Sequence, residues 1–257
     1  MQADPRSPSA HRFKLFWQPG CSSCVRTKEF LQKRGVDFES VNVAANPERL
    51  AELRALGARS VPIVSSGDTY TLCQSIQDVA SFVGVPMEAR EPLAGPVLFD
   101  RLQKVLGAAI RFTLQFPVAS LRETFRDRNR TLGDTAFHIF RVAEMGLETG
   151  QGHPLRPEGF AQKAPADWGG EQIAAYGRDV SARLDRWWAC ADPAVAHRVE
   201  TYYGRRTMHE VLERTTWHAA QHARQLVLML EAHGIAADRP LTPADLAGLP
   251  MPDDPWG

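Results

Sequence analysis

Two histidines one helical turn apart are the residues whose types and spacing most clearly predict chemistry in this 257-residue chain. His218 and His222 lie in the run 207–233, which contains no glycine or proline and places apolar side chains at steps of three and four residues. Because residues i and i+4 of a helix share a face, both imidazoles fall on the face predicted to be buried. Two imidazoles so placed can bind one metal ion together.

A third histidine, His138, lies on another predicted amphipathic helix, where it shares a face with Leu132 and Val142. A single histidine on an apolar face is usually a hydrogen-bonded core residue, and that interpretation stays open. Neighbouring neutral imidazoles, however, are hard to satisfy in a core without a shared partner. His138, His218 and His222 therefore form a candidate metal site. Three imidazoles suit zinc, nickel, iron or copper, and three protein ligands leave a position open, as in catalytic sites.

The motif Cys21-Ser22-Ser23-Cys24 predicts a second chemistry, thiol–disulfide exchange. It follows a predicted strand and opens a predicted helix, whose dipole and unpaired amides would stabilise a thiolate at Cys21. Cys24, inside the helix and more shielded, would resolve a mixed disulfide. Half a zinc site and two incidental core cysteines are the alternatives. A zinc site would need two more ligands nearby, and the chain has no second Cys-x-x-Cys.

Composition argues against several classes of partner. Thirty basic and 30 acidic residues give a formal net charge of zero, which favours neither nucleic acid nor an anionic membrane as a partner. No run reaches the ~18 apolar residues of a membrane span, and the polar N-terminus lacks a signal-peptide core, so we expect a cytoplasmic protein. The basic run Arg122, Arg126, Arg128 and Arg130 is predicted to be a solvated helix end and loop.

Patterning near the N-terminus predicts a β-α-β-α-β-β-α order over residues 12–85. The expected strands are 13–17, 38–43, 61–64 and 69–72, and the expected helices are 21–34, 47–57 and 75–83. A βαβ unit makes its two strands parallel, so the expected architecture is an α/β sandwich. Residues 1–11 are predicted to be a disordered leader.

Beyond a proline-bearing linker at 86–96, the sequence predicts only helices. They are expected at 97–115, 131–148, 171–189 and 207–233. Four amphipathic helices with two long connections predict an all-α four-helix bundle over 97–235. The remaining segment, 236–257, contains five prolines and is predicted to wrap the surface or to be partly disordered.

Residues 12–85 resemble a glutaredoxin, an α/β protein of the thioredoxin-like fold. The resemblance rests on Cys21-Ser22-Ser23-Cys24 and on Ser60-Val61-Pro62. It implies that Pro62 is cis and abuts the dithiol, that Val61 and Pro62 form a groove for glutathione, and that Gln74 and Ser75 receive its γ-glutamyl end. The sequence departs from the family in lacking Gly-Gly before the last helix, where Cys73 is present instead. We expect Cys73 to be a small buried residue.

Residues 97–235 resemble the DinB-like family of four-helix bundles. The resemblance rests on Leu132-Gly133-Asp134 leading to His138, and on His218-x-x-x-His222-x-x-Gln225. It implies that the three histidines bind one divalent metal in an enzyme that uses a low-molecular-weight thiol.

Together, the two resemblances imply a thiol enzyme with two domains. A glutaredoxin-type thiol–disulfide oxidoreductase would be coupled to a metal-dependent, glutathione-using transferase or isomerase. Its partners would be a small-molecule thiol and an electrophile, and it could form a homodimer. Two alternatives stay open. The chain could be a non-catalytic redox or metal sensor, or a simple disulfide reductase with the bundle as a scaffold.

Overall fold

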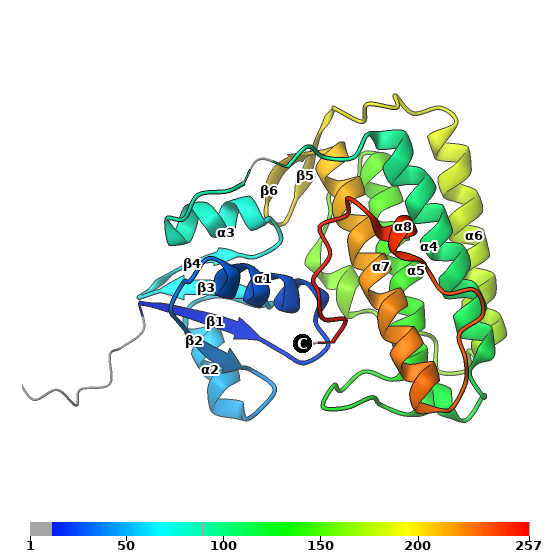
Figure 1. The fold of residues 1–257 in the computed structure, drawn as a ribbon, viewed down its shortest axis with the longest axis horizontal. Coiled ribbons are helices and arrows are strands. Elements are labelled where there is room, and N and C mark those ends of the chain that lie inside the picture. Colours follow the sequence, from blue (N-terminus) through cyan, green and yellow to red (C-terminus); the bar gives the residue numbers. More distant parts are fainter. Residues whose placement is uncertain (1–11, 89, 257) are drawn as a thin grey trace, which may run out of the picture. The chain divides into compact units, whose positions relative to one another are not determined.

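The computed structural model describes residues 12–88 and 90–256, which divide between residues 88 and 89 into two compact units (Figure 1). The first unit is a sheet with helices, and the second is largely helical. The predicted leader, residues 1–11, lies outside the described residues. None of the helices in the described ranges combines the length and the apolar character that crossing a membrane requires.

The first unit is a four-stranded sheet with the predicted element order. It comprises β1 (Phe13–Trp17), α1 (Ser22–Lys33), β2 (Phe38–Asn42), α2 (Pro47–Ala55), β3 (Ile63–Ser66), β4 (Thr69–Leu72) and α3 (Ile76–Val83). The strand order is β2-β1-β3-β4, with β1 parallel to β2 and the other pairs antiparallel. β3 begins at Ile63 and not at Val61 as predicted, because Pro62 has no backbone N–H to donate to a ladder.

Alternation along β1 builds one core on each face of this sheet. Leu15 packs with Leu31 of α1 and Val79 of α3, and all three side chains are fully buried. Phe16, the next residue, points to the other face and packs in the cluster that contains Leu53 of α2. Because both faces of β1 are covered, the end of the strand and the start of α1 are held firmly. That junction is where the dithiol motif lies.

Four long helices pack against one another in the second unit. They are α4 (Gly95–Gln115), α5 (Leu132–Gly150), α6 (Gly170–Trp188) and α7 (Met208–Ala232). α4 and α5 each pack against both α6 and α7. Each predicted helix is present with its ends within two residues of the expected ones. α4 begins inside the predicted linker because Pro96 is tolerated in a first turn. Gly95 also allows close packing, since a Cβ there would overlap the Pro193 carbonyl oxygen.

The prediction that no strand follows the linker is wrong. β5 (Arg198–Thr201) and β6 (Gly204–Thr207) form an antiparallel hairpin immediately before α7. Its strands, Arg-Val-Glu-Thr and Gly-Arg-Arg-Thr, contain one large apolar residue, Val199, which is too few for a clear alternation in the sequence. The hairpin turns at Gly204, whose φ of 106° is a conformation that side chains disfavour. The short helices η1 (Ser120–Arg122), η2 (Pro157–Ala161) and α8 (Pro243–Leu246) complete the unit.

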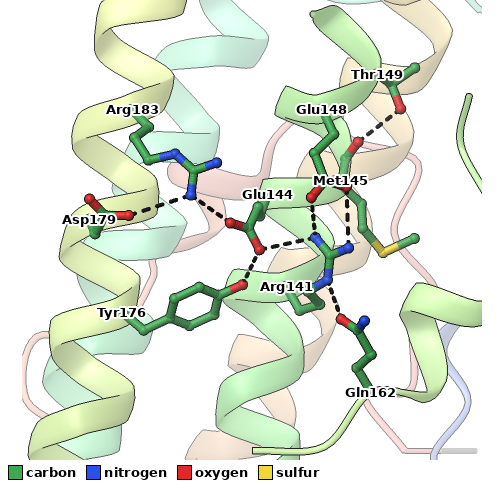
Figure 2. Close-up of polar contacts among 9 residues, drawn as sticks. All are labelled: Arg141, Glu144, Met145, Glu148, Thr149, Gln162, Tyr176, Asp179 and Arg183. Atoms are coloured by element: carbon green, nitrogen blue, oxygen red, sulfur yellow. Dashed lines mark hydrogen bonds and ion pairs between the residues drawn. The ribbon is translucent and has the colours of Figure 1, made fainter. Parts of the chain in front are cut away.

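A network of charged side chains ties α5 to α6 and to the segment after η2 (Figure 2). Glu144 of α5 accepts hydrogen bonds of 2.5 Å from Tyr176 and from Arg183, both of α6. Arg141 lies 3.0 Å from Glu144 and donates to Gln162, which follows η2, at 2.5 Å. Burial alone would raise the pKa of Glu144, but the bonds from Tyr176 and Arg183 outweigh it, so this pKa lies below its usual value.

We expect Glu144→Gln to lower the free energy of unfolding by roughly 1–3 kcal/mol at neutral pH, because Arg141 and Arg183 lose their shared carboxylate. The pKa of Glu144 is depressed in the folded protein. Its stabilising effect is therefore present above the unfolded-state pKa and is lost as pH falls through the folded one. Urea denaturation of both proteins should show a difference that narrows in acid. Glu171→Gln, at an exposed glutamate of α6, is the control and should change the free energy of unfolding little. A difference that widens in acid would contradict this role.

Candidate functional site

Three histidines from two helices converge in the helical unit. His138 comes from α5, whereas His218 and His222 come from α7, and each is at most 6% exposed. The Nε2 atom of His218 lies 3.3 Å from that of His138 and 3.1 Å from that of His222. One ligand atom from each of the three lies within 4.8 Å of the others. The structure thus brings together the three histidines selected from the sequence, here called the triad. Their role as metal ligands stays a prediction.

Local sequence features align the two helices that carry the triad. Gly146 of α5 lies against Thr215 of α7, where a Cβ would be 2.8 Å from the Thr215 hydroxyl oxygen, so the helices approach closely. Thr131 caps α5 by accepting a hydrogen bond from the Asp134 amide at 3.0 Å. Thr207 begins a capping box with Glu210 at the start of α7. These contacts fix where each helix begins and therefore which face each histidine occupies.

Gln225 fixes the orientation of His222. Its side-chain oxygen lies 2.6 Å from Nδ1 of His222. Because an amide oxygen can only accept, Nδ1 must carry the proton, which leaves the lone pair of Nε2 directed at the triad. The amide nitrogen of Gln225 donates to the Pro255 carbonyl at 2.9 Å, so the amide cannot be reversed without losing that bond. No role was predicted for Gln225 from the sequence, although it belongs to the histidine motif. Its position three residues after His222, within one helical turn, indicates that the two side chains can meet.

The C-terminal tail supports Gln225 from outside. The Gln221 amide donates to the Pro255 carbonyl at 2.8 Å, and Arg224 donates to the Pro252 carbonyl at 2.8 Å. Trp256 is only 4% exposed and belongs to the core of the helical unit. The tail was predicted either to wrap the surface or to be partly disordered. Its described residues, 236–256, pack on the helical unit. Polar side chains of α7 hold it there, and apolar patterning cannot predict such contacts.

Burial and neighbouring cations keep the triad uncharged. Burial lowers the pKa of all three imidazoles well below the usual range. The next cause is the charge of Arg130 for the pKa of His138 and the charge of Arg128 for that of His222. The Nδ1 atoms of His138 and His218 are buried and have no hydrogen-bond partner among the described residues. The three imidazoles are therefore neutral, and Nε2 of His222, whose Nδ1 carries the proton, presents its lone pair to Nε2 of His218.

The donor set of the triad fits a divalent metal. In tetrahedral coordination with bonds of about 2.1 Å, two ligand nitrogens are about 3.4 Å apart. The two Nε2–Nε2 distances given by the structure, 3.3 and 3.1 Å, are close to this value. A metal bound at the three Nε2 atoms would use each of them as a ligand, with the proton of each ring on Nδ1, as the Gln225 contact already requires for His222. Neutral imidazoles are ligands for zinc, nickel, iron and copper alike, so the triad does not select one metal.

An aromatic side chain from η2 packs against the triad. The Phe160 ring lies 6.0 Å from the His218 ring and 6.2 Å from the His138 ring, measured between centroids. The guanidinium of Arg214 lies 4.8 Å from the centre of the Phe160 ring, and the Tyr202 ring lies 6.0 Å away. Tyr202 belongs to the turn of the β5–β6 hairpin, so this unpredicted element contributes to the surroundings of the triad.

The prediction of a solvated basic run is wrong for two of its four arginines. Arg122 and Arg126 are exposed, but Arg128 and Arg130 are partly buried. Burial lowers the pKa of Arg128 to about 9 and that of Arg130 to about 10, so both stay charged at neutral pH. The Nη2 atom of Arg130 donates to the Phe160 carbonyl at 3.1 Å. A charge pattern alone does not show that a loop turns inward before the next helix.

The dithiol lies at the N-terminus of α1. Cys21 is the N-cap residue, and its sulfur accepts a hydrogen bond from the Cys24 amide at 3.3 Å. The two cysteines form a disulfide with a Cα–Cα distance of 5.2 Å. Cys24 is 2% exposed, and Cys21 is more accessible. This is the placement expected for an attacking and a resolving thiol, but the two roles stay predictions.

The residues assigned to a thiol-binding groove lie around β3 and the start of α3. The Val61–Pro62 peptide bond is cis, as expected, and the Pro62 carbonyl accepts a hydrogen bond from the Cys73 amide at 3.1 Å. Ser75 is the N-cap residue of α3, and Gln74 is 6% exposed. Cys73 is buried as predicted, and burial raises the pKa of its thiol. The part that Val61, Pro62, Gln74 and Ser75 would play in binding a thiol stays a prediction.

Sequence comparisons identify the first unit, and a structure comparison gives only a distant likeness. Among solved structures, a variant of a mycothiol-dependent maleylpyruvate isomerase is 18% identical with a TM-score of 0.41, over 52% of this chain and 61% of that one. The glutaredoxin family model matches residues 13–71. Glutaredoxin-like protein NrdH of Escherichia coli (strain K12) is 40% identical over 57 residues, which are 22% of this chain and 70% of the relative. Glutaredoxin of Pseudomonas aeruginosa is 41% identical over 51 residues, 20% of this chain and 61% of the relative. The chain therefore belongs to the glutaredoxin family through its N-terminal, glutaredoxin-like thiol–disulfide oxidoreductase domain.

Proposed function

We propose that this chain joins its glutaredoxin-like oxidoreductase to a metal-dependent transferase or isomerase that uses a small thiol, with glutathione as the first candidate. The observation that carries the proposal is the convergence of three buried, neutral imidazoles in the helical unit. We also propose that this unit is a DinB-like four-helix bundle. The order of its long helices supports that assignment, with His138 on the second and the His218/His222 pair on the fourth.

The triad would hold the metal, and Gln225 would keep His222 in the ligating tautomer. A divalent metal bound there would supply a lowered thiol pKa, and hence a thiolate at neutral pH. Three protein ligands leave at least one coordination position for that thiol. Phe160 packs against two of the three rings and would limit the access of water to the triad.

The dithiol would act on mixed disulfides. The Cys21 thiolate attacks the glutathione sulfur of a mixed disulfide, and the substrate leaves as a thiolate that takes a proton from water. Cys24 then attacks the Cys21 sulfur and releases glutathione, which leaves the Cys21–Cys24 disulfide. Two further glutathione molecules reduce that disulfide and are themselves oxidised to glutathione disulfide. The exposure of Cys21 and the shielding of Cys24 support this order.

We expect Cys21→Ser to abolish reduction of a small mixed disulfide and Cys24→Ser to trap a glutathione adduct on Cys21. The reason is that the helix dipole and free amides act on the first sulfur. Both variants should be made in a Cys190→Ser background, because Cys190 is an exposed free thiol that could form adducts of its own. Mass spectrometry of tryptic peptides locates the adduct. If Cys24 is the more acidic thiol in pH-dependent alkylation, the assigned roles are reversed.

We expect the purified full-length protein to bind one divalent metal, and alanine at any triad position to lower its affinity at least ~10-fold. Gln225→Ala should weaken binding by a similar factor, because His222 loses its orienting partner. His209→Ala is the matched control: His209 also lies on α7, but its Nε2 contacts the Leu93 carbonyl at 2.8 Å. Elemental analysis and competition with a chromophoric chelator supply the measurements. Stoichiometric metal in the His218→Ala/His222→Ala protein would refute the site.

Measuring thiol-dependent turnover in the same wild-type and variant proteins distinguishes the enzyme from the sensor and from the disulfide reductase. We expect the metal-loaded protein to accelerate glutathione-dependent conversion of at least one member of a panel of epoxides, alkyl halides and unsaturated acids. Triad variants should lose this activity and keep disulfide reduction. Bound metal without thiol-dependent turnover would favour the sensor, and absence of metal would favour the disulfide reductase with a helical scaffold.

A further inference from the structure

One guanidinium beside the triad has a buried donor that no described residue satisfies. Arg130 stands just before α5, and its Nη2 donates to the carbonyl of Phe160, whose ring packs against the triad. The Nη1 atom of the same side chain is buried and has no hydrogen-bond partner among residues 12–88 and 90–256. Leaving a buried donor unpaired costs about 1–3 kcal/mol, and more when the group is charged. A ligand that accepts this hydrogen bond would remove that cost.

Two arginines contact Phe160, the residue whose ring packs against the triad. The Arg130 guanidinium donates to its carbonyl, and the Arg214 guanidinium lies 4.8 Å from the centre of its ring. Arg214 is itself only 6% exposed. Asp134 acts on Arg130, but its side-chain oxygen also accepts a hydrogen bond from the Ala164 amide at 3.1 Å. A metal on the triad would add two further positive charges. Such a site attracts anions, and its low dielectric strengthens the attraction.

We propose that Arg130, with Arg128 nearby, binds a carboxylate group of a co-substrate beside the triad. The inference deepens the proposed function and rests on it, because it takes the co-substrate to bind at the metal. A guanidinium presents parallel N–H donors that match the two oxygens of a carboxylate. One edge of Arg130 is committed to the Phe160 carbonyl, and Nη1 is the donor left for the ligand. The carboxylate belongs either to the electrophile or to the thiol, and both sources share this chemistry.

A purely structural role for Arg130 would need only its bond to Phe160. A lysine at this position could keep the charge and one hydrogen bond, but it could not offer a second donor in a fixed plane. Arg130→Lys should therefore preserve folding and still bind carboxylates more weakly than the wild type. Arg130→Gln removes the charge as well and should weaken binding further. Arg178→Gln removes an exposed arginine of α6 and is the matched control.

The test is calorimetric titration of the zinc-loaded full-length protein with unreactive probes. Succinate represents an acidic electrophile, S-methylglutathione represents the thiol, and the dimethyl ester of each, which lacks the carboxylates, is its control. We expect at least one acid to bind, and its ester to bind at least ~10-fold more weakly. Arg130→Gln should lower the affinity for the acid by ~10-fold or more and leave the affinity for the ester unchanged. If Arg130→Gln lowers the affinity for succinate alone, the carboxylate belongs to the electrophile. If it lowers the affinity for S-methylglutathione alone, the carboxylate belongs to the thiol.

Two outcomes would overturn the carboxylate site. One is failure of both acids to bind the wild type, and the other is equal affinity of wild type and Arg130→Gln for every acid that binds. Circular dichroism confirms that each variant is folded, and zinc content is measured in every sample. Wild-type protein that takes up no zinc contradicts the proposed function. Protein that holds zinc but binds acids independently of Arg130 contradicts only the carboxylate site.

Discussion

The rest of the helical unit depends on one constraint: three neutral imidazoles converge inside its packed core and must be held in place there. Each buried ring nitrogen needs a partner, and the Nδ1 atoms of His138 and His218 have none among the described residues, while the Nε2 atoms lie 3.1–3.3 Å apart in two pairs. Such a cluster persists only if the surrounding helices hold it in place or a cation is shared among the rings. The glycine contact between α5 and α7, the caps of both helices and the Gln225 bond all serve that purpose.

Support for the triad extends well beyond its own two helices. The tail meets α7 through Gln221, Arg224 and Gln225, so a segment some thirty residues after His222 helps to fix that ring. Arg141 of α5 donates to Gln162 and thereby holds the segment that follows Phe160 (Figure 2). In the first unit, fewer contacts position the reactive residue. There the N-terminus of α1 stabilises one sulfur directly, and the strand before it is covered on both faces.

Local periodicity and short motifs were sufficient to predict much of this structure. The i, i+4 spacing placed His218 and His222 on one buried face, and the strand–Cys21–helix context placed the dithiol at a helix start. What could not be predicted depends on contacts between distant segments. The β5–β6 hairpin has a single large apolar residue, Val199, and so shows no alternation, and the tail is held by polar side chains of α7. The burial of Arg128 and Arg130 follows from the path of a loop, which charge counting cannot reveal.

The most direct test of the central claim is X-ray absorption at the zinc edge, recorded on zinc-loaded full-length protein with its dithiol oxidised. The proposed site requires three nitrogen neighbours at about 2.0–2.1 Å from the metal. Addition of glutathione should then introduce one sulfur neighbour at about 2.3 Å. A shell of oxygen atoms alone, or a nitrogen shell that survives unchanged in the His218→Ala/His222→Ala protein, would contradict a metal centre built on these histidines.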